Sequence, residues 1–402
     1  MMTTIGVVAF VVALLVSVML HELGHFAFAK RYGMKATQFF VGFGPTLWSR
    51  QRGETEYGVK AVPAGGFVKI IGMTDLEEVD PEDQPRAFYR QPAGKRAIVL
   101  AAGSLVHFAI AIVLLLVVFM GIGLLAATTT VGQVSPCVPT SGTACTGGDT
   151  ESPARVAGLR AGDEIVEFGG TRIHDWEQLQ GLIRDAGAGE ASMVVLRDGQ
   201  RVTLTPELVE RSRPSLTNPN RSEDVGVIGF TPTLVSERLG PVDAVERTGE
   251  NFGRLVTGTF QALGQIPAAV PDLVRATFGD GERSAEGLVG PVGIGKVSGD
   301  IVSQNEPLSS RIAQFIALVA GLNVFVGIFN LLPLLPLDGG HLAVLGFEQG
   351  RSRLYRLLGR ADPGRVDLNR LLPAAYLFLV LLIGLSVLLL AADIINPVST
   401  PL

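Results

Sequence analysis

The sequence has few charged residues and almost no cysteine. Asp, Glu, Lys and Arg make up only 18% of the 402 residues, whereas hydrophobic residues make up 47% and the mean hydropathy is +0.38. This composition excludes an ordinary soluble protein of this size and indicates a chain that is part membrane-spanning and part soluble. The net charge of −5, without Lys/Arg clusters interleaved with aromatic residues, argues against a nucleic-acid partner.

The two cysteines, Cys137 and Cys145, lie in one stretch that is rich in Ser, Thr, Gly and Pro. They are either two free thiols or one disulfide formed in an oxidising compartment. The stretch itself favours neither interpretation.

Four apolar segments are long enough to cross a bilayer, which needs about 20 residues. They are residues 1–29, 97–127, 312–337 and 371–392. Glu22 is the one charged residue in the first segment, and the other three contain none. The first segment lacks a basic leader and a small-residue cleavage site, so we interpret it as a span and not as a signal peptide.

Lys and Arg residues beside the spans predict the orientation in the plasma membrane. The loop after the first span and the loop before the fourth are basic near the membrane, whereas both chain ends lack Lys and Arg. The basic residues are Lys30, Arg31, Lys35, Arg90, Lys95 and Arg96 in the first loop, and Arg351, Arg353, Arg356, Arg360, Arg365 and Arg370 in the second. Basic loops stay cytoplasmic, so we expect both termini and residues 128–311 to be extracytoplasmic. This placement suits the disulfide.

These patterns divide the chain into four parts. Residues 1–127 hold the first two spans and a small β element (54–72) at the cytoplasmic membrane face. Residues 128–210 have the pattern of a compact α+β domain, with a strand over Glu164–Phe168, a helix from Trp176 and a hairpin over 193–205 that turns on Asp198-Gly199. Residues 211–311 combine a polar loop (211–224) with a helix over 245–278, which is either amphipathic at the membrane surface or packed. Residues 312–402 hold the last two spans.

The first span contains His21-Glu22-Leu23-Gly24-His25, an H-E-x-x-H pattern. Residues i and i+4 share one face of a helix, so both imidazoles can bind one metal ion. Glu22 can then act as the general base toward a water molecule. A chance match or a soluble zinc enzyme would also contain this pattern. However, a Glu and two His residues inside an apolar span are costly at membrane depth and indicate function.

Asp338 is the expected third metal ligand. A catalytic zinc ion usually has three protein ligands and one open position. Asp338 ends the third span in Asn330-Leu331-Leu332-Pro333-Leu334-Leu335-Pro336-Leu337-Asp338-Gly339-Gly340. At 1.5 Å per residue, His21 lies about 24 Å into a hydrocarbon core about 30 Å thick. The third span also runs from outside to inside, so Asp338 at its inner end lies in the same cytoplasmic third of the membrane. The alternative is a helix-ending Asp-Gly turn.

Two further polar residues lie in spans. Asn330 either contacts the substrate backbone or an oxyanion, or caps the broken helix. His107 stands alone in the second span, and a lone His is more often a packing residue, so we leave it outside the site.

At these motifs the chain resembles the site-2 protease family of intramembrane zinc proteases, especially the actinobacterial members with a PDZ domain. The matching residues span nearly the whole chain in family order: HELGH (21–25), VGFGPTLWS (41–49), ETEYGVKAVPAGGF (54–67), the PDZ-like stretch 152–183, GPVGIG (290–295) and NLLPLLPLDGG (330–340). Two departures concern Leu335, where relatives often have proline, and Gly103-Ser104-Leu105-Val106-His107, where many have Gly-Pro-x-x-Asn. One PDZ-like stretch is present, whereas the best-known enterobacterial relative has two.

The resemblance implies a role for each matching residue. His21, His25 and Asp338 would bind Zn²⁺, Glu22 would activate water, and Asn330 would contact substrate. The strand of Gly65, Gly66 and Phe67 would pair with an unwound substrate. The protein partners would be membrane-anchored substrates, namely anti-sigma factors that another protease has already trimmed. The lipid bilayer would surround the enzyme. The oligomeric state stays open.

The fold class expected is therefore a polytopic α-helical membrane protein with four transmembrane helices, a small cytoplasmic-face β element and an inserted extracytoplasmic α+β PDZ-like domain. Two other functions fit some of these features. A receptor or scaffold with a non-catalytic metal site would have lost a ligand or Glu22, and all four residues are present. A transporter would show inverted repeats, and the sequence shows none.

Overall fold

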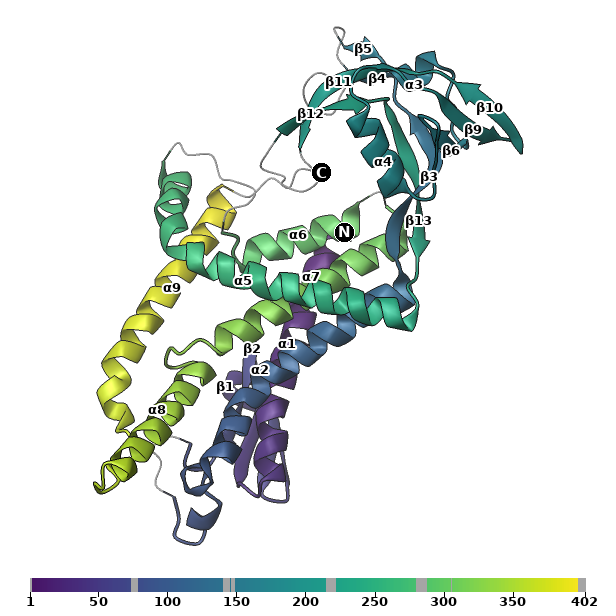
Figure 1. Ribbon diagram of the computed structural model, residues 1–402. Helices are drawn as coiled ribbons and strands as arrows, with labels where there is room; N and C mark the ends of the chain where they lie inside the picture. Colours follow the sequence, from purple (N-terminus) through teal and green to yellow (C-terminus); the bar gives the residue numbers. More distant parts are fainter. Residues whose placement is uncertain are drawn as a thin grey trace. The chain divides into compact units, whose positions relative to one another are not determined.

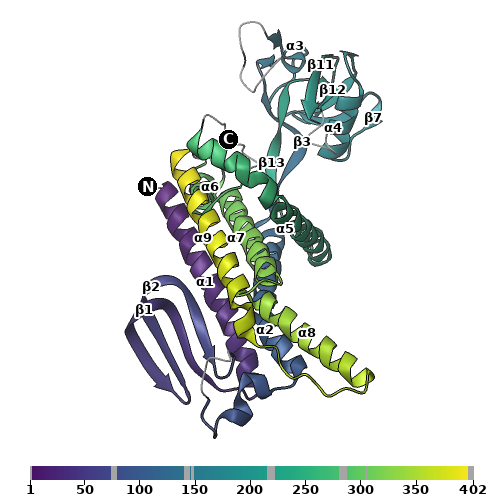
Figure 2. The ribbon, with the colours of Figure 1, turned by 90° about the vertical axis from the view of Figure 1, so that its left-hand side faces the viewer.

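The computed structural model describes residues 2–73, 79–139, 145, 149–214, 222–279, 288–304 and 306–396. The chain forms two compact units, which Figures 1 and 2 show in two views. The first, here called the helical unit, combines Met1–Ile122 with Leu239–Leu402. The second, here called the inserted unit, is Gly123–Arg238. Each unit is described by itself.

Among the described residues, four helices of the helical unit are long and apolar enough to cross a membrane, which confirms the four spans expected from the sequence. With 23 to 30 residues each, they reach about 30 Å or more at 1.5 Å per residue. They are α1 (Met2–Arg31), α2 (Ala93–Leu116) with the π-helical turns of η3 (Val117–Ile122), α7 (Leu308–Asn330), and α9 (Leu372–Ile395) after the short η4 (Leu368–Leu371).

Two of the expected span boundaries were wrong. The segment 97–127 leaves the helix at Ile122, because the apolar residues from Leu124 onward pair as a strand with the segment that ends at Glu237. The segment 312–337 is interrupted at Asn330, where α7 ends, and residues 331–337 are irregular. Apolar composition alone does not distinguish a strand or a broken turn from a continuing helix.

The helical unit also contains α5 (Pro241–Phe278), α6 (Pro291–Ser303) and α8 (Asp338–Leu357). The helix expected over 245–278 is confirmed as part of α5. Its apolar residues Phe252, Leu255 and Val256 pack against a core cluster from α2 and α7, and α5 crosses both helices in Figure 1. α6 packs along α1.

The small β element is a hairpin of β1 (Ala36–Arg52) and β2 (Thr55–Ile70), followed by the short 3-10 helices η1 (Gln84–Arg86) and η2 (Phe88–Arg90). Both strands bend, so that Phe40 of β1 pairs with Phe67 on one side and with Gly58 on the other. The end of β2 from Gly66 to Ile70 therefore lies at an edge of this sheet. That edge stands beside α1 (Figure 2).

The inserted unit is built on antiparallel strands around one apolar core. Its main sheet has the order β10-β9-β6-β3-β13, with β7 also pairing with β6. The strands are β3 (Leu124–Val134), β6 (Glu164–Phe168), β7 (Thr171–Arg172), β9 (Met193–Arg197), β10 (Gln200–Leu204) and β13 (Phe230–Glu237). Two helices, α3 (Pro153–Val156) and α4 (Trp176–Asp185), pack with them. The expected strand, helix start and hairpin are confirmed.

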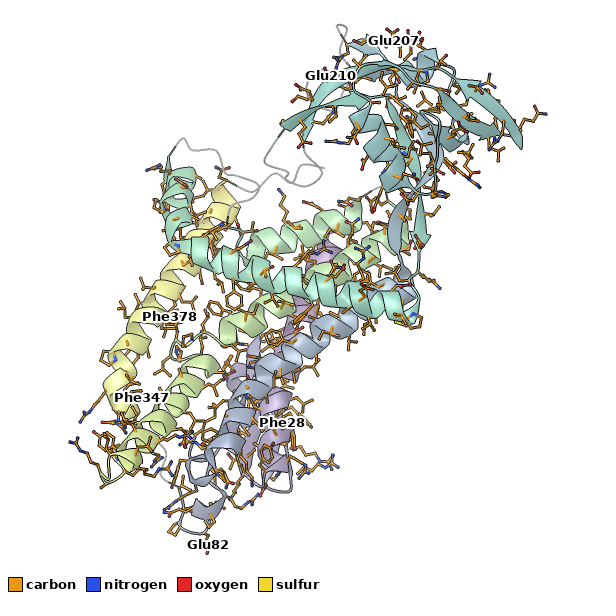
Figure 3. The ribbon with its side chains drawn as sticks, in the orientation of Figure 1. Phe28, Glu82, Glu207, Glu210, Phe347 and Phe378 are labelled. Atoms are coloured by element: carbon orange, nitrogen blue, oxygen red, sulfur yellow. A yellow bond between two sulfur atoms is a disulfide. The ribbon has the colours of Figure 1, made fainter. Side chains whose placement is uncertain are left out.

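A second sheet, of order β12-β11-β8, extends this unit beyond residue 210. Its strands are β8 (Gly189–Glu190), β11 (Glu207–Pro214) and β12 (Ser222–Val227). The expectation of a loop over 211–224 was wrong for its described ends, because β11 and β12 pair there. On β11, Glu207 and Glu210 are exposed (Figure 3), whereas Leu208 is buried in the core of the unit.

A disulfide joins Cys137 and Cys145, with their Cα atoms 5.9 Å apart. It lies next to the short pair β4 (Cys137–Val138) and β5 (Thr150–Glu151). The disulfide alternative is therefore confirmed.

Candidate active site

The two histidines of the H-E-x-x-H pattern lie on the inner face of α1. His21 is 7% exposed and His25 is 4% exposed. α1 is continuous through both residues, so their side chains project from successive turns of one helix face. Their Nε2 atoms lie 3.1 Å apart. Two buried imidazole nitrogens this close suit a shared metal ion.

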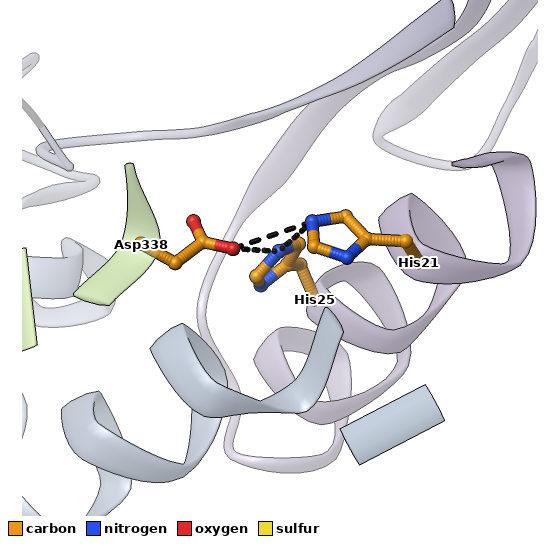
Figure 4. Close-up of side chains that lie close together, drawn as sticks. All are labelled: His21, His25 and Asp338. Atoms are coloured by element: carbon orange, nitrogen blue, oxygen red, sulfur yellow. Dashed lines mark hydrogen bonds and ion pairs between the residues drawn. The ribbon is translucent and has the colours of Figure 1, made fainter. Parts of the chain in front are cut away.

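Asp338 joins this pair from the opposite end of the chain. It is the first residue of α8, and its Oδ2 lies 3.3 Å from Nε2 of His21 and 3.2 Å from Nε2 of His25 (Figure 4). The irregular residues 331–337 separate α7 from α8 and let the chain turn. Because this segment is not helical, the first residue of α8 can face α1.

The two glycines after Asp338 explain how the chain makes this turn. A Cβ on Gly339 would lie 2.2 Å from the carbonyl carbon of Leu331, and a Cβ on Gly340 would lie 2.6 Å from that of Leu334. Neither position has room for a side chain. The Asp-Gly-Gly sequence therefore combines a candidate ligand with the close backbone approach that directs it toward the two histidines.

The three ligand atoms fit a zinc ion. Zinc binds imidazole nitrogen and carboxylate oxygen at about 2.0–2.1 Å, so two ligand atoms of a tetrahedral site lie about 3.3 Å apart. The three observed separations are 3.1, 3.2 and 3.3 Å. Within the described part of the chain, this is the one group of three His, Cys, Asp or Glu residues close enough to hold a metal ion. Three protein ligands leave one coordination position open, as in catalytic zinc sites.

Glu22 lies beside the ligands and does not belong to the group. Its Oε2 accepts a hydrogen bond from the backbone N–H of Val68 on β2, at 3.1 Å. The carboxylate thus sits between the metal ligands of α1 and the edge of the hairpin. This position suits a base that is not a ligand.

The segment of Gly65, Gly66 and Phe67 also lies against α1. A Cβ on Gly66 would be 2.5 Å from Sδ of Met19. Met19 lies on α1, three residues before Glu22. Gly65 adopts a φ of 128°, which favours glycine. Phe67 stacks on Phe40 with ring centroids 5.6 Å apart. The structure therefore brings this edge next to the face of α1 that carries Glu22.

Asn330 is the last residue of α7 and is half-buried. Its side chain makes no hydrogen bond to any residue that the structure describes, and it is outside the metal group. A role for it in substrate binding stays a prediction.

Sequence reasoning missed one residue of the site, Gly103 on α2. A Cβ there would lie 2.4 Å from Cε1 of His21 and 2.5 Å from Nε2 of His25. The backbone of α2 can pass the metal ligands only because residue 103 has no side chain. Its one sign in the sequence is a glycine inside an apolar span, which many spans share for packing reasons.

His107, one helical turn further along α2, is also near the site. Its ring centroid lies 5.0 Å from that of His21, and its side chain is fully buried. The sequence argument that treated it as a packing residue did not foresee this contact.

Fold and site together define a class: a multi-pass membrane protein with a buried metal group of the metalloprotease type. The model of peptidase family M50 matches residues 9–357, and the chain belongs to this family. It is 38% identical to the zinc metalloprotease Rip1 of Mycobacterium tuberculosis and 37% identical to Rip1 of Mycolicibacterium smegmatis, in each case over 99% of both chains. It is 31% identical to a putative zinc metalloprotease of Mesorhizobium japonicum over 85% of this chain and 88% of that one. The protein is thus a zinc metalloprotease, as its resemblance to site-2 proteases implied.

Proposed function

We propose that this zinc metalloprotease cuts peptide bonds within the membrane-spanning segments of membrane-anchored proteins. One observation carries the proposal: the two histidines of the metal group and Glu22 lie on α1, an apolar helix of spanning length, and Glu22 contacts the edge of the β hairpin. A protease of soluble substrates has no need to place these residues inside an apolar helix, where they are costly.

Each site residue has a separate role in this proposal. His21, His25 and Asp338 hold the zinc ion. When bound, the zinc ion acts as a Lewis acid that polarises a peptide carbonyl and makes a water molecule acidic enough to attack near neutral pH. Glu22 removes the proton from the attacking water and then delivers it to the nitrogen of the leaving amine.

The edge of β2 presents the substrate to these residues. A peptide bond in a helix is already hydrogen-bonded, so the substrate must unwind locally before it can be cut. Successive residues of a strand direct their backbone groups to opposite sides, and the N–H of Val68 points to Glu22 and not to β1. The backbone of Gly66, two residues away, faces the same side. An unwound segment can therefore add to this edge through Gly65, Gly66 and Phe67, while Asn330 holds its backbone from α7.

The inserted unit selects substrates. We place it, with both termini, on the extracytoplasmic side because the basic loops flank the opposite ends of the spans. Within it, α3, β6, β7 and most of α4 form the stretch 152–183 whose sequence resembles a PDZ domain. Substrates are membrane stubs that another protease has trimmed, with anti-sigma factors as the expected class. A domain on that side can restrict approach by proteins with large extracytoplasmic parts.

The test compares wild type with Glu22→Gln and with a His21→Ala, His25→Ala double variant. Glu22→Gln should keep its zinc and accumulate uncut membrane-embedded fragments, which mass spectrometry would identify as the substrates. The double variant should lose zinc. Near-normal cleavage by Glu22→Gln, or cuts that fall only outside membrane-spanning segments, would refute the proposal.

A further inference from the structure

The two metal-binding histidines differ in what holds their second ring nitrogen. Nδ1 of His25 lies 2.7 Å from the backbone carbonyl oxygen of Val99, to which it can donate. Nδ1 of His21 is buried and has no hydrogen-bond partner among the described residues. A histidine that binds a metal almost always donates its other N–H to a fixed acceptor, which sets the orientation of the ring. His21 therefore requires an acceptor.

The ring of His107 lies beside that of His21 and can supply it. The two rings lie with their centroids 5.0 Å apart and their planes at 41°. Nε2 of His107 is buried and, like Nδ1 of His21, has no partner in the described structure. Two adjacent unpaired nitrogens can bond after a small ring rotation or share one bridging water.

The hydrogen bonds behind His107 determine which of its nitrogens carries the proton. The amide nitrogen Nδ2 of Asn323 donates to the backbone carbonyl of Val319 at 2.8 Å and to Oγ of Ser17 at 3.1 Å. A backbone carbonyl can only accept, so the amide orientation is settled and Oδ1 of Asn323 faces His107. Oδ1 lies 2.8 Å from Nδ1 of His107, so Nδ1 carries the proton. Nε2 of His107 is then a bare acceptor.

The metal side determines which nitrogen of His21 carries the proton. Its Nε2 faces Asp338 and His25, and a nitrogen that binds zinc cannot carry a proton. The proton of a neutral imidazole must then sit on Nδ1, which becomes a donor on the ring beside His107. Donor and acceptor alternate correctly along the whole series Asn323, His107, His21.

We propose that His107 is a positioning residue for the metal site, and that Asn323 and His107 together hold His21 in the tautomer and orientation that bind zinc. This inference rests on the proposed role of His21 as a zinc ligand. The series joins three helices through residues that are far apart in the chain: Ser17 and His21 on α1, His107 on α2 and Asn323 on α7. Packing of these helices thereby sets the geometry of the ligand.

The experiment measures the zinc dissociation constant of the full-length protein in detergent by competition with a chelator. The variants are His107→Leu, Asn323→Leu, the double variant and His107→Gln. His107→Leu should weaken zinc binding by about 10- to 100-fold, the usual effect of removing such a partner. In this proposal the effect of Asn323 on His21 passes through His107, so the double variant should bind zinc as His107→Leu does. Gln can place an acceptor oxygen near the position of Nε2, so His107→Gln should recover part of the affinity.

Two controls separate positioning from general stability. Thr259→Val removes a different buried polar group of the helical unit, a hydroxyl, and should leave zinc affinity unchanged. The visible spectrum of the cobalt-substituted protein should change in His107→Leu. The thermal unfolding temperature of the zinc-free protein should stay close to that of wild type, so that the loss of zinc does not reflect lower stability. Unchanged affinity in His107→Leu, additive effects in the double variant, or an equal loss of zinc-free stability would overturn the inference. If the His21→Ala, His25→Ala double variant still binds zinc, the assignment of these histidines as zinc ligands is wrong, and this inference fails with it.

Discussion

The carboxylate of Glu22 accepts a hydrogen bond from the backbone N–H of Val68, with Oε2 and the amide nitrogen 3.1 Å apart. One residue stands next to a metal ligand on α1, and the other lies on the outer edge of β2. The proposed base and the proposed substrate-binding edge are thus in direct contact. A substrate strand that adds to this edge arrives where Glu22 already is.

This contact predicts that Val68→Pro will impair cleavage without removing zinc. Proline has no N–H, so it cannot bond to Glu22 or to an added strand, although an edge strand tolerates it. A hydrogen bond to a charged group contributes about 1.5–3 kcal/mol, so the cleavage rate should fall at least about tenfold. The matched control is Val68→Ala, which keeps the N–H and should retain activity. Equal activity of the proline and alanine variants would contradict the role of the N–H.

Gly103→Ala should weaken zinc binding, because its Cβ would overlap the rings of both histidines. The control lies on the same helix: Gly94 is exposed, and a Cβ added there would meet no atom within 4 Å. Gly94→Ala should therefore leave zinc in place. Metal analysis of the two purified variants decides between them. Full zinc content in Gly103→Ala would show that α2 can move away from the ligands.

The inserted unit should lose stability at acidic pH through Asp163. Burial raises the pKa of this carboxyl, but two hydrogen bonds from Arg197, at 2.7 and 2.8 Å, and one from the N–H of Arg160 outweigh it, so the pKa lies below the ordinary value of 3.8. A depressed pKa stabilises the fold above the unfolded-state pKa, and this contribution is lost as the pH falls through the folded-state value.

Asp163→Asn should consequently lower the free energy of opening of strands β6 and β9 at neutral pH. The expected decrease is about 3 kcal/mol, the cost of breaking a buried ion pair. The difference from wild type should shrink below about pH 4 as the wild-type carboxyl loses its advantage. Hydrogen–deuterium exchange of the β6 and β9 amides in the full-length protein measures this. A difference that stays constant down to the acid unfolding range would show that the ion pair is not its cause.

Removal of the inserted unit should leave the chemistry intact. The metal ligands and Glu22 all belong to the helical unit. Leu124 and Glu237 are paired at the two ends of the inserted unit, so a short Gly/Ser linker can replace residues 123–238. This variant should bind zinc, cut a short membrane stub and also cut substrate that has not been trimmed. A cell-based assay with both substrates tests it. A variant that binds zinc and cuts neither would show that the unit supports catalysis or docking.

The sequence determined those features whose physical cause is local. H-E-x-x-H places two imidazoles on one helix face whatever surrounds it, and the cost of polar groups at membrane depth marks them as functional. The expected depth of His21 follows from the rise per residue of a helix. The strand Glu164–Phe168 and the hairpin at Asp198-Gly199 follow from their own residues, and the structure confirms them.

Only the tertiary structure decided the features that depend on distant partners. Gly103 belongs to the site because α2 crosses α1 at that residue, and His107 meets Asn323 across 216 positions of the chain. The inserted unit continues past residue 210 because β13 returns to pair with β3. A side chain's neighbours and a strand's partner are set by packing and by hydrogen bonds between remote segments, and no local pattern of residues records them.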